Sequence, residues 1–339
     1  MSIKRIRPII FFTIMTVILN VPSAFGESIV FRIGTGGSAG TYFPIGSLIS
    51  QAITNADLQT RNEVGQKKTV VAIAQRSNGS VANVSDIENG LLEAGLSQAD
   101  VAHWTFYATG PFSDMKPKKS IRTIASLYSE SIHLVARKDS GIKSIDDLVG
   151  RKVSIDEFGS GTLFDVKLVL SAFGIELDDI EPVYLKPNDA IERFKNDTLD
   201  AFILVAGYPV QQVVDLAYEE LATIIPIDGP VVEKLVNEHS FFSTDTVPAG
   251  TYKNSSDINT LSVSAQFIVN ANLSDEMVYK ISKTLWSKET RTRLGKGHPI
   301  GKAISLENAI KGVSIPLHPG AIRFYNEMNM VVKKLSTSE

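Results

Sequence analysis

The sequence predicts an α/β protein with two lobes and a ligand cleft between them, and three observations carry this prediction. Short runs rich in β-branched residues alternate with amphipathic segments, as they do where parallel strands are connected by helices. Two longer strand-like segments, which begin at Ser131 and at Thr260, divide the chain into a middle part and two ends. About 313 residues follow a predicted N-terminal leader, which is more than one hydrophobic core usually serves.

The strands are predicted at six apolar runs, which in chain order are residues 28–33, 69–74, 121–128, 152–155, 201–206 and 223–227. The amphipathic segments between these runs are predicted to be helices. The segment from Ser131 is interpreted as a strand, a glycine turn, a short helix and another strand. Its short helix carries a capping-box pattern, with Ser144 at the cap and Asp147 three residues later.

In the strand that begins at Thr260, apolar and polar residues alternate. Predicted helices follow it to the end of the chain. If both long segments cross between the lobes, residues 27–130 and 270–339 form lobe 1, and residues 131–269 form lobe 2. Binding sites prefer the interfaces between domains, so we expect the ligand cleft at the crossover strands.

The N-terminal segment, residues 1–26, is predicted to be a secretory signal peptide. Lys4, Arg5 and Arg7 form a basic start, and the apolar run at 9–19 is short for a membrane span. Small residues then stand at the −3 and −1 positions of a cleavage site. We therefore expect a protein exported to the periplasm.

Composition limits the classes of partner. The net charge is −3, and removal of the three basic residues of the leader would make it −6. With no basic block, nucleic acid is not an expected partner. The chain has no Cys, so it forms no disulfide and has no thiol chemistry. No cluster of His, Asp and Glu has metal-ligand spacing, so we expect no metal or cofactor, and we expect a monomer.

The stretch GTGGSAGTYFPIG, residues 34–46, fits three motifs. It matches G-x-G-x-x-G/A of dinucleotide-binding loops, but bulky Tyr42 and Phe43 stand where the helix would start. It also matches the G-x-S-x-G elbow of hydrolases, but Ser38 comes too soon after the leader for the strands that precede such an elbow. The third interpretation is a glycine-rich turn whose helix N-terminus binds an anion. A simple tight turn remains the alternative.

A second loop of this kind, residues 159–162, follows the strand at 152–155 and precedes a helix. One such loop falls in each predicted lobe, so two helix N-termini facing each other would hold a small acidic ligand. Gln98, after a short strand, is a further candidate for the cleft. Asp100 is expected to be the N-cap of the helix that starts at Val101.

The sequence holds an ordered set of motifs, namely GTGGSAGTYFPIG, SNGSVANV, GLLEAGLSQAD, LYSESIHLVARKDSGIKSIDDLVGRKVSIDEFGSGT, AGYPVQQVVDLA and IPLHPGAIRFY. This set resembles the TAXI family, the TRAP-associated extracytoplasmic immunogenic solute receptors, over nearly all of the chain after the leader. The resemblance implies a type II-like, two-lobed periplasmic binding protein. It also implies capture of a small organic acid or amino acid, such as glutamate or 2-oxoglutarate, and delivery to an ion-driven TRAP permease.

By motif position, the resemblance implies a set of ligand-binding residues, which are Gly36, Thr41, Tyr42, Asn78, Gln98, Tyr128, Ser129, Ser160, Gly161, Thr162, Gly207 and Tyr208. Two of these positions depart from the family pattern. Ser129 stands where the family often has Pro, and Asn78 stands where Gly is frequent. Both departures lie near the predicted cleft, so the identity of the ligand stays open.

Four other residues have side chains that could bind a ligand or transfer a proton. Arg76 is the best charged candidate for a ligand carboxylate, with a surface position as the alternative. Glu130 and His133 are three residues apart and therefore point to opposite faces of a strand, which argues against an acid–base pair. We expect His133 either to contact the ligand or the interface between the lobes, or to be a packed histidine of the hinge. His318, before Pro319, is expected to cap a turn or helix.

Two other functions remain as alternatives to a transport receptor. A periplasmic ligand sensor that docks on a signalling receptor would show the same sequence features. A serine hydrolase would use Ser38 or Ser160 as its nucleophile, although no histidine stands in a local triad signature.

Overall fold

The structure is a computed structural model that describes residues 28–61, 65–333 and 335, so the predicted signal peptide lies outside the described residues. Its strands are β1 (Ser28–Gly34), β2 (Gln59–Arg61), β3 (Lys67–Gln75), β4 (Ala94–Gln98), β5 (Ile121–Arg137), β6 (Lys152–Ser154), β7 (Glu181–Val183), β8 (Ala201–Ala206), β9 (Ala222–Ile225), β10 (Phe242–Val247) and β11 (Ile258–Asn270).

The helices are α1 (Tyr42–Asn55), α2 (Ser80–Glu88), α3 (Ala99–Tyr107), α4 (Thr162–Ala172), α5 (Pro187–Lys195), α6 (Gln211–Tyr218), α7 (Pro230–Glu238), α8 (Asp275–Leu285), α9 (Lys288–Gly297) and α10 (Pro319–Glu327). A helical turn at Ile145–Leu148 carries the predicted capping box, which is confirmed at Ser144 and Asp147. Within the described part of the chain, no helix has the length and apolar character needed to cross a membrane.

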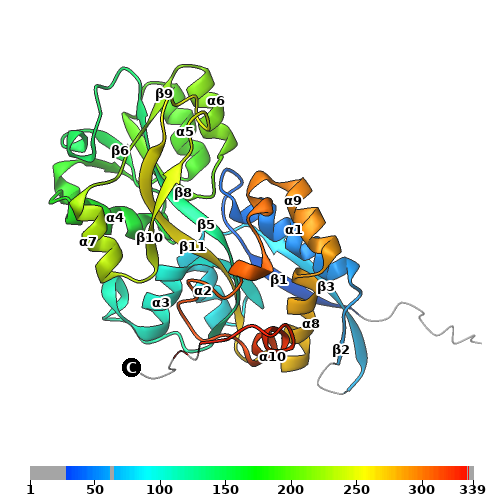
Figure 1. Ribbon diagram of the computed structural model, residues 1–339. Coiled ribbons are helices and arrows are strands. Elements are labelled where there is room, and N and C mark those ends of the chain that lie inside the picture. The colour runs from blue at the N-terminus through cyan, green and yellow to red at the C-terminus, as the bar shows by residue number, and fades with distance from the viewer. Residues whose placement is uncertain (1–27, 62–64, 334, 336–339) are drawn as a thin grey trace, which may run out of the picture.

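Two groups of parallel strands define the two lobes (Figure 1). In lobe 1, β1 lies between β3 and β4 and runs parallel to both. In lobe 2, β6 lies between β8 and β7 and runs parallel to both. The antiparallel strands β5 and β11 lie between these groups, in the order β2-β3-β1-β4-β11-β5-β8-β6-β7. The α/β class and the type II-like binding-protein architecture predicted from the sequence are confirmed.

The long strands cross from one lobe to the other. Strand β11 pairs with β10 as far as Val263 and with β4 from Ala265, so it passes between the lobes at Ser264. Strand β5 begins to pair with β8 at Ser131. The division predicted from the sequence, after residues 130 and 269, falls within these two strands. The runs predicted at 121–128 and from Ser131 form one strand of 17 residues.

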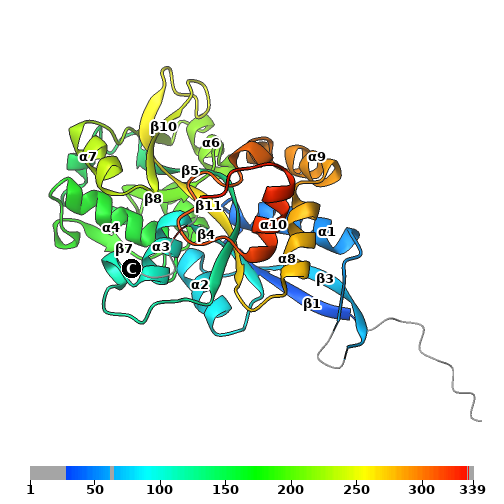
Figure 2. The same ribbon diagram turned by 60° about the horizontal axis from the view of Figure 1, so that its bottom comes forward.

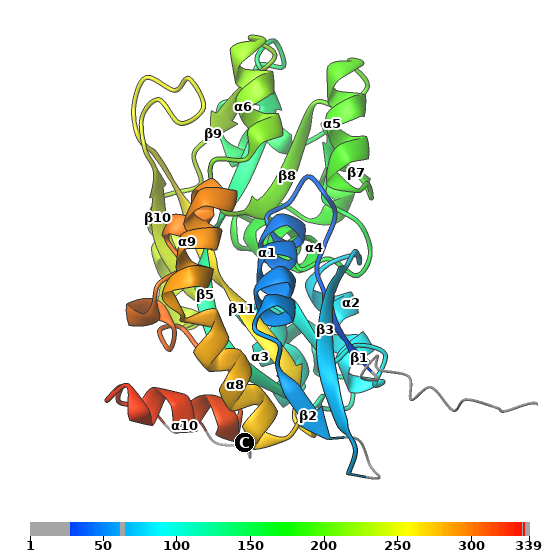
Figure 3. The same ribbon diagram turned by 90° about the vertical axis from the view of Figure 1, so that its right-hand side faces the viewer.

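The apolar core lies in clusters on the two lobes. In lobe 1, side chains of α1 and α8 meet β1 and the first half of β5, with Ile45, Phe267 and Ile281 among the fully buried members. In lobe 2, one cluster joins β8 to α5 and α6. A further cluster joins β6 and α4 of lobe 2 to Ala99, Trp104 and Phe112 of lobe 1, so apolar packing also connects the lobes. Figures 2 and 3 show α1, α8 and α9 side by side on lobe 1, and Figure 3 shows α5 and α6 of lobe 2 above them.

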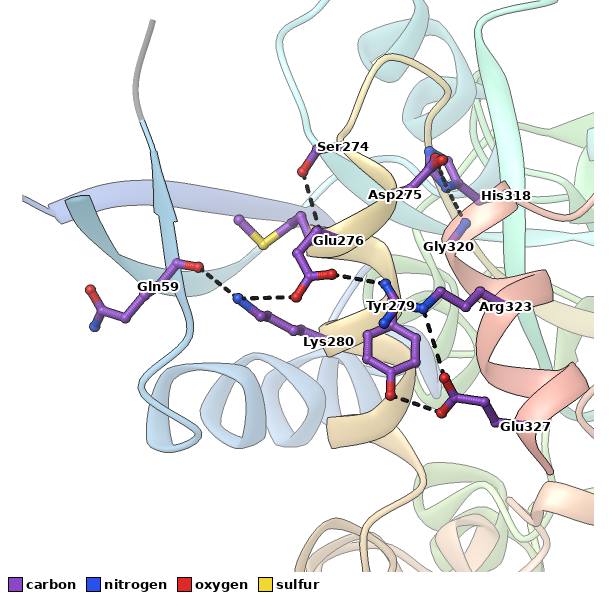
Figure 4. Close-up of polar contacts among 11 residues, drawn as sticks. Gln59, Ser274, Asp275, Glu276, Tyr279, Lys280, His318, Gly320, Arg323 and Glu327 are labelled. Carbon is purple, nitrogen blue, oxygen red and sulfur yellow. Dashed lines mark hydrogen bonds and ion pairs between the residues drawn. The ribbon is translucent and has the colours of Figure 1, made fainter. Parts of the chain in front are cut away.

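The C-terminal helix α10 is held on α8 by polar contacts that Figure 4 shows. Arg323 donates to Glu276 over 2.9 Å and lies over the ring of Tyr279 at 3.9 Å. The Tyr279 hydroxyl donates to Glu327 over 2.8 Å. The described end of the chain therefore completes the lobe in which the described chain begins.

The start of α10 fits closely against α8. His318 is the N-cap of α10, and its Nδ1 accepts from the Gly320 N–H over 3.2 Å, which confirms the predicted capping role. A Cβ atom on Gly320 would lie 2.2 Å from the carbonyl oxygen of Asp275. Only glycine therefore allows this approach of the two backbones.

Candidate functional site

A small cavity lies between the two lobes, where β5 crosses from one to the other. Its volume is about 70 Å³, which is room for a few water molecules. Its walls come from both lobes, and the lining residues are Gly36, Gly37, Gly40, Thr41, Tyr42, Asn78, Gly79, Ser80, Gln98, Glu130, Asp156, Glu157, Ser160, Gly161, Thr162, Pro187 and Val205.

Three helices begin at this cavity. Tyr42 is the first residue of α1, Ser80 of α2 and Thr162 of α4, and all three line the cavity. The N–H groups of a first helical turn have no acceptor within the helix and carry partial positive charge. The N-cap residues of these three helices make no side-chain cap hydrogen bond. The N–H groups of Ala82 and Leu163 already have acceptors, which are the Gly159 carbonyl and the Ser160 hydroxyl. The first N–H group of each helix remains at the edge of the cavity and favours an anionic group there.

The lobes touch each other beside the cavity. The Asn78 side-chain amide of lobe 1 donates to the Phe158 carbonyl of lobe 2 over 3.1 Å. The Ala82 N–H, in the first turn of α2, donates to the Gly159 carbonyl over 3.1 Å. Gly159 has a φ of +93° and would place a Cβ atom 3.2 Å from the Cβ atom of Asn78. The structure therefore shows a closed arrangement of the lobes.

Thr41 connects three elements at the floor of the cavity. Its hydroxyl donates to Glu130 Oε1 over 3.2 Å and accepts from the Tyr128 hydroxyl over 3.1 Å. The Gly207 N–H, from lobe 2, points to the same oxygen over 3.4 Å. Thr41 stands at the N-cap of α1 without a side-chain cap hydrogen bond. Its hydroxyl thus makes hydrogen bonds at the junction of the lobes and does not cap the helix.

Glu130 is a buried carboxyl group in the cavity wall, with 2 % of its surface exposed. Its Oε1 accepts from Thr41, and its Oε2 has no hydrogen-bond partner among the described residues. Burial raises the pKa of Glu130 to about 8, and the nearby hydroxyls of Tyr42 and Thr41 oppose this rise. Burial and the nearby Glu130 raise the pKa of Tyr42 well above its ordinary value.

A second buried acidic group lies at the same junction. The Gln98 amide of lobe 1 donates to Asp165 Oδ2 of lobe 2 over 2.6 Å. Asp100, from the first turn of α3, faces Asp165 and interacts with its carboxyl group. Burial and the neighbouring carboxyl of Asp100 hold the pKa of Asp165 well above its ordinary value, and burial raises the pKa of Asp100.

Lobe 2 adds two acidic side chains to the cavity wall. Burial raises the pKa of Asp156 to about 6, although hydrogen bonds from the Glu157 N–H and from the Thr162 and Ser160 side chains favour its charged form. Burial raises the pKa of Glu157 as well. Lys186 lies 3.8 Å from Glu157. The cavity wall thus carries three carboxyl groups in all, counting Glu130 from β5.

No Lys, Arg or His is among the described residues that line the cavity. Arg76 is exposed and lies over the ring of Phe43 at 4.6 Å, so it does not line the cavity. His133 is buried away from the cavity, with Nε2 2.9 Å from the Tyr252 hydroxyl. In the part of the chain that is described, no group of three or more His, Asp and Glu residues is placed to hold a metal ion.

The structure brings eight of the twelve residues implied by the resemblance to the cavity wall, and these are Gly36, Thr41, Tyr42, Asn78, Gln98, Ser160, Gly161 and Thr162. Tyr128 and Gly207 stand behind Thr41 and reach the cavity only through it. Ser129 is exposed, because successive residues of a strand point to opposite faces. Tyr208 donates to the Thr246 carbonyl within lobe 2 over 3.2 Å and does not line the cavity.

Sequence reasoning missed several wall residues. Gly79 has a φ of +106° and lies against the backbone of lobe 2, where a Cβ atom on it would be 3.5 Å from the Cα atom of Ser160. Asp156 follows β6 with a φ of +70°. Glu130 was weighed only as half of an acid–base pair, yet its place in an apolar strand was a signal, since acids are rarely buried without a partner.

One assignment from the sequence was wrong. Asp100 is not the N-cap of α3, because Gln98 already has the extended backbone of a cap, with φ −63° and ψ 148°, and the helix begins at Ala99. The Asp100 side chain instead faces Asp165. Glu130 and His133 do point to different surroundings, as their odd spacing predicted.

The two serines of the hydrolase alternative have other hydrogen bonds. Ser38 Oγ accepts from the Asn188 amide over 3.1 Å, and Ser160 Oγ accepts from the Leu163 N–H over 3.2 Å. The Ser160 hydroxyl therefore supports the first turn of α4.

The fold and the cavity at the junction of the lobes define a protein of the two-lobed, type II-like periplasmic binding-protein class. The MatC protein of Rhodopseudomonas palustris, solved with bound malate, superposes with a TM-score of 0.51 at 12 % identity, covering 88 % of this chain and 96 % of that one. The alkanesulfonate-binding protein SsuA of Xanthomonas axonopodis superposes with a TM-score of 0.48 at 14 % identity, covering 89 % and 84 %.

Residues 33–328 match the NMT1-like family, and the chain belongs to that family. A putative binding protein of Brucella abortus (strain 2308) is 27 % identical over 92 residues, which is 27 % of this chain. The match spans 28 % of the length of that relative. The finer assignment to the TAXI family stays a prediction.

Proposed function

We propose that this protein is an exported receptor that closes its two lobes around one small organic acid or amino acid. The observation that carries the proposal is the position of the cavity, whose wall combines Thr41 and Gln98 of lobe 1 with Thr162 of lobe 2. A ligand that contacts both lobes favours the closed arrangement over an open one, because it binds that arrangement more tightly.

Recognition of a carboxylate rests on the helix N-termini. Those of α1, α2 and α4 meet at the cavity, and this kind of site binds carboxylates through backbone N–H groups. Malate bound to MatC is an example of a small carboxylate in this fold.

Delivery to a membrane permease of the TRAP type is the second part of the proposal. It is supported by the ordered motifs shared with the TAXI family and by the predicted leader, which directs the chain to the periplasm. A sensor of the same fold would instead dock on a signalling receptor after it binds the solute. Uptake of the bound solute into vesicles that contain the candidate permease, with and without this protein, distinguishes the two.

The binding function is tested by calorimetry on the protein without its leader, against amino acids, 2-oxo acids and dicarboxylates. We expect one solute per chain, and NMR of the recovered solute should show it unchanged. Conversion of the solute at enzyme-like rates, or no binding of any of these compounds, would contradict the proposal.

A further inference from the structure

Glu130 is a buried acid whose second oxygen has no partner. It lies in the middle of β5, where the strand crosses between the lobes, and it lines the cavity with 2 % of its surface exposed. Thr41 donates to Oε1, while Oε2 has no hydrogen-bond partner at normal distance among the described residues. Buried polar atoms are nearly always satisfied, so an unpaired one in a ligand cavity indicates where a ligand donor belongs.

The surroundings of Glu130 do not supply an opposite charge. From α1 it is faced by the hydroxyl of Tyr42, and from α3 and α4 by the acids Asp100 and Asp165. The described residues that line the cavity include no cationic side chain, and Asp156 and Glu157 add further negative charge. A solute with two carboxylates would place one of them near these acids, which is unfavourable at such low exposure to water.

The cavity therefore has two kinds of wall. The starts of α1, α2 and α4 offer backbone N–H groups to an anion, and Glu130 offers an oxygen to a donor or cation. We propose that Glu130 binds the protonated amine of the solute, so that the solute is a zwitterion such as an α-amino acid, and not a 2-oxo acid or a dicarboxylate. This proposal rests on the proposed function and names its ligand class.

An ammonium group fits the chemistry of this position. It provides three hydrogen-bond donors, and its positive charge supplies the opposite charge that the surroundings of Glu130 do not. Charge-assisted hydrogen bonds of this kind are stronger than neutral ones. The keto oxygen of a 2-oxo acid is only an acceptor, so it pairs only with the protonated, uncharged form of Glu130 and makes no charge-assisted hydrogen bond. Loss of a hydrogen bond to a charged group corresponds to roughly a 10- to 150-fold weaker Kd.

The experiment compares matched solutes on the protein without its leader. Thermal shifts with the twenty amino acids select the best binder, and calorimetry then compares it with its own 2-oxo acid and with its N-acetyl derivative. We expect the amino acid to bind about 10- to 150-fold more tightly than either analogue. Equal or tighter binding of the 2-oxo acid, or of a dicarboxylate that carries no amine, would overturn the proposal.

The variant Glu130→Gln keeps the shape of the side chain and removes its charge. We expect it to lose the preference for the amino acid while its Kd for the 2-oxo acid changes little. Glu307→Gln, an exposed acid outside the cavity, is the matched control and should behave as the unmodified protein. A preference that survives in Glu130→Gln would refute the role of Glu130.

If Glu130→Gln does not fold, the comparison of amino acid with its two analogues on the unmodified protein still decides the ligand class. Binding of a solute without an amine overturns this inference and leaves the proposed receptor function intact. Binding of none of the amino acids, 2-oxo acids or dicarboxylates overturns both.

Discussion

Gln98 and Asp165 join the two lobes through one short hydrogen bond. The Gln98 amide, at the end of β4, donates over 2.6 Å to Asp165 Oδ2 in the first turn of α4. Oδ1 of Asp165 and both carboxyl oxygens of Asp100 have no hydrogen-bond partner at normal distance among the described residues. Closure of the lobes therefore removes two neighbouring carboxyl groups from water, which favours their protonated forms.

We predict that closure takes up protons at this pair. Burial raises the pKa of Asp165 well above 3.8 and raises that of Asp100. We expect both pKa values to fall toward the ordinary value when the lobes separate and water reaches the carboxyl groups. A carboxyl group whose pKa is raised in the closed state does not change the free energy of closure below its ordinary pKa, because it is protonated in both states. Above the ordinary pKa, closure becomes less favourable as the pH rises toward the raised pKa. The pair should therefore oppose closure more strongly at pH 8 than at pH 5.

The variant Asp165→Asn tests this linkage, since it keeps the shape of the side chain and cannot ionise. We expect its solute affinity, relative to the unmodified protein, to increase from pH 5 to pH 8, by at most about tenfold per pH unit. Glu130 also faces the pair, but it is present in both proteins and its effect largely cancels in the ratio. The exposed Asp178→Asn is the control, and a ratio that stays constant over this range would refute the linkage.

Ser160 and Thr162 are predicted to have separable roles at the start of α4. The Ser160 hydroxyl accepts from the Leu163 N–H, so Ser160→Ala should lower the free energy of unfolding by about 1 kcal/mol. The Thr162 side chain lines the cavity beside Asp156. If it also donates to the solute, Thr162→Val should weaken the Kd by roughly 10- to 150-fold with less effect on stability.

Urea unfolding and calorimetry on both variants measure these two effects. Weaker stability with an unchanged Kd for Thr162→Val would assign that hydroxyl to the fold alone. In that case the solute would be held by other donors of the cavity wall.

The sequence was sufficient to predict the α/β class and the general position of the site. The glycines at 34–40 and 159–161 marked two helix starts, because only small residues allow a ligand or a facing backbone to approach so closely. The ordered motifs added Gln98 and Asn78, which both line the cavity.

The remaining features depend on contacts between distant parts of the chain. Thr41 was predicted as a residue of the ligand site, but no local pattern shows that its hydroxyl donates to Glu130, 89 residues away. Asp100 and Asp165 lie on separate helices of separate lobes, so no local pattern shows that they meet. The 17-residue length of β5 was hidden because the polar residues Ser129 and Glu130 interrupt its apolar pattern.

The contact between α8 and α10 provides a test of the fold. Gly320→Ala would place a Cβ atom 2.2 Å from the Asp275 carbonyl and 2.8 Å from the Tyr279 nitrogen, so we expect a loss of about 1–3 kcal/mol in the free energy of unfolding. The control is Gly295→Ala in α9, where a Cβ atom would meet only Lys302 at 3.7 Å.

That control should raise stability by about 0.5–1 kcal/mol, because alanine favours a helix over glycine. Urea unfolding measures both changes. Equal stability of the two variants would contradict the close packing of α10 on α8.

The central claim is that a solute closes the two lobes on each other, and a distance between the lobes tests it most directly. The chain has no native Cys, so Asn55→Cys on α1 and Glu192→Cys on α5 carry spin labels at two exposed positions only. Pulsed electron–electron double resonance then measures the distance between the two spin labels with and without the best-binding amino acid. A pair within lobe 1, Asn55→Cys with Asn89→Cys, is the control.

We predict that the solute shifts the distance between α1 and α5 from a broad distribution to one narrow distribution that matches the closed structure, while the distance within lobe 1 stays unchanged. Identical distributions between the lobes with and without saturating solute, starting from an open protein, would contradict the account.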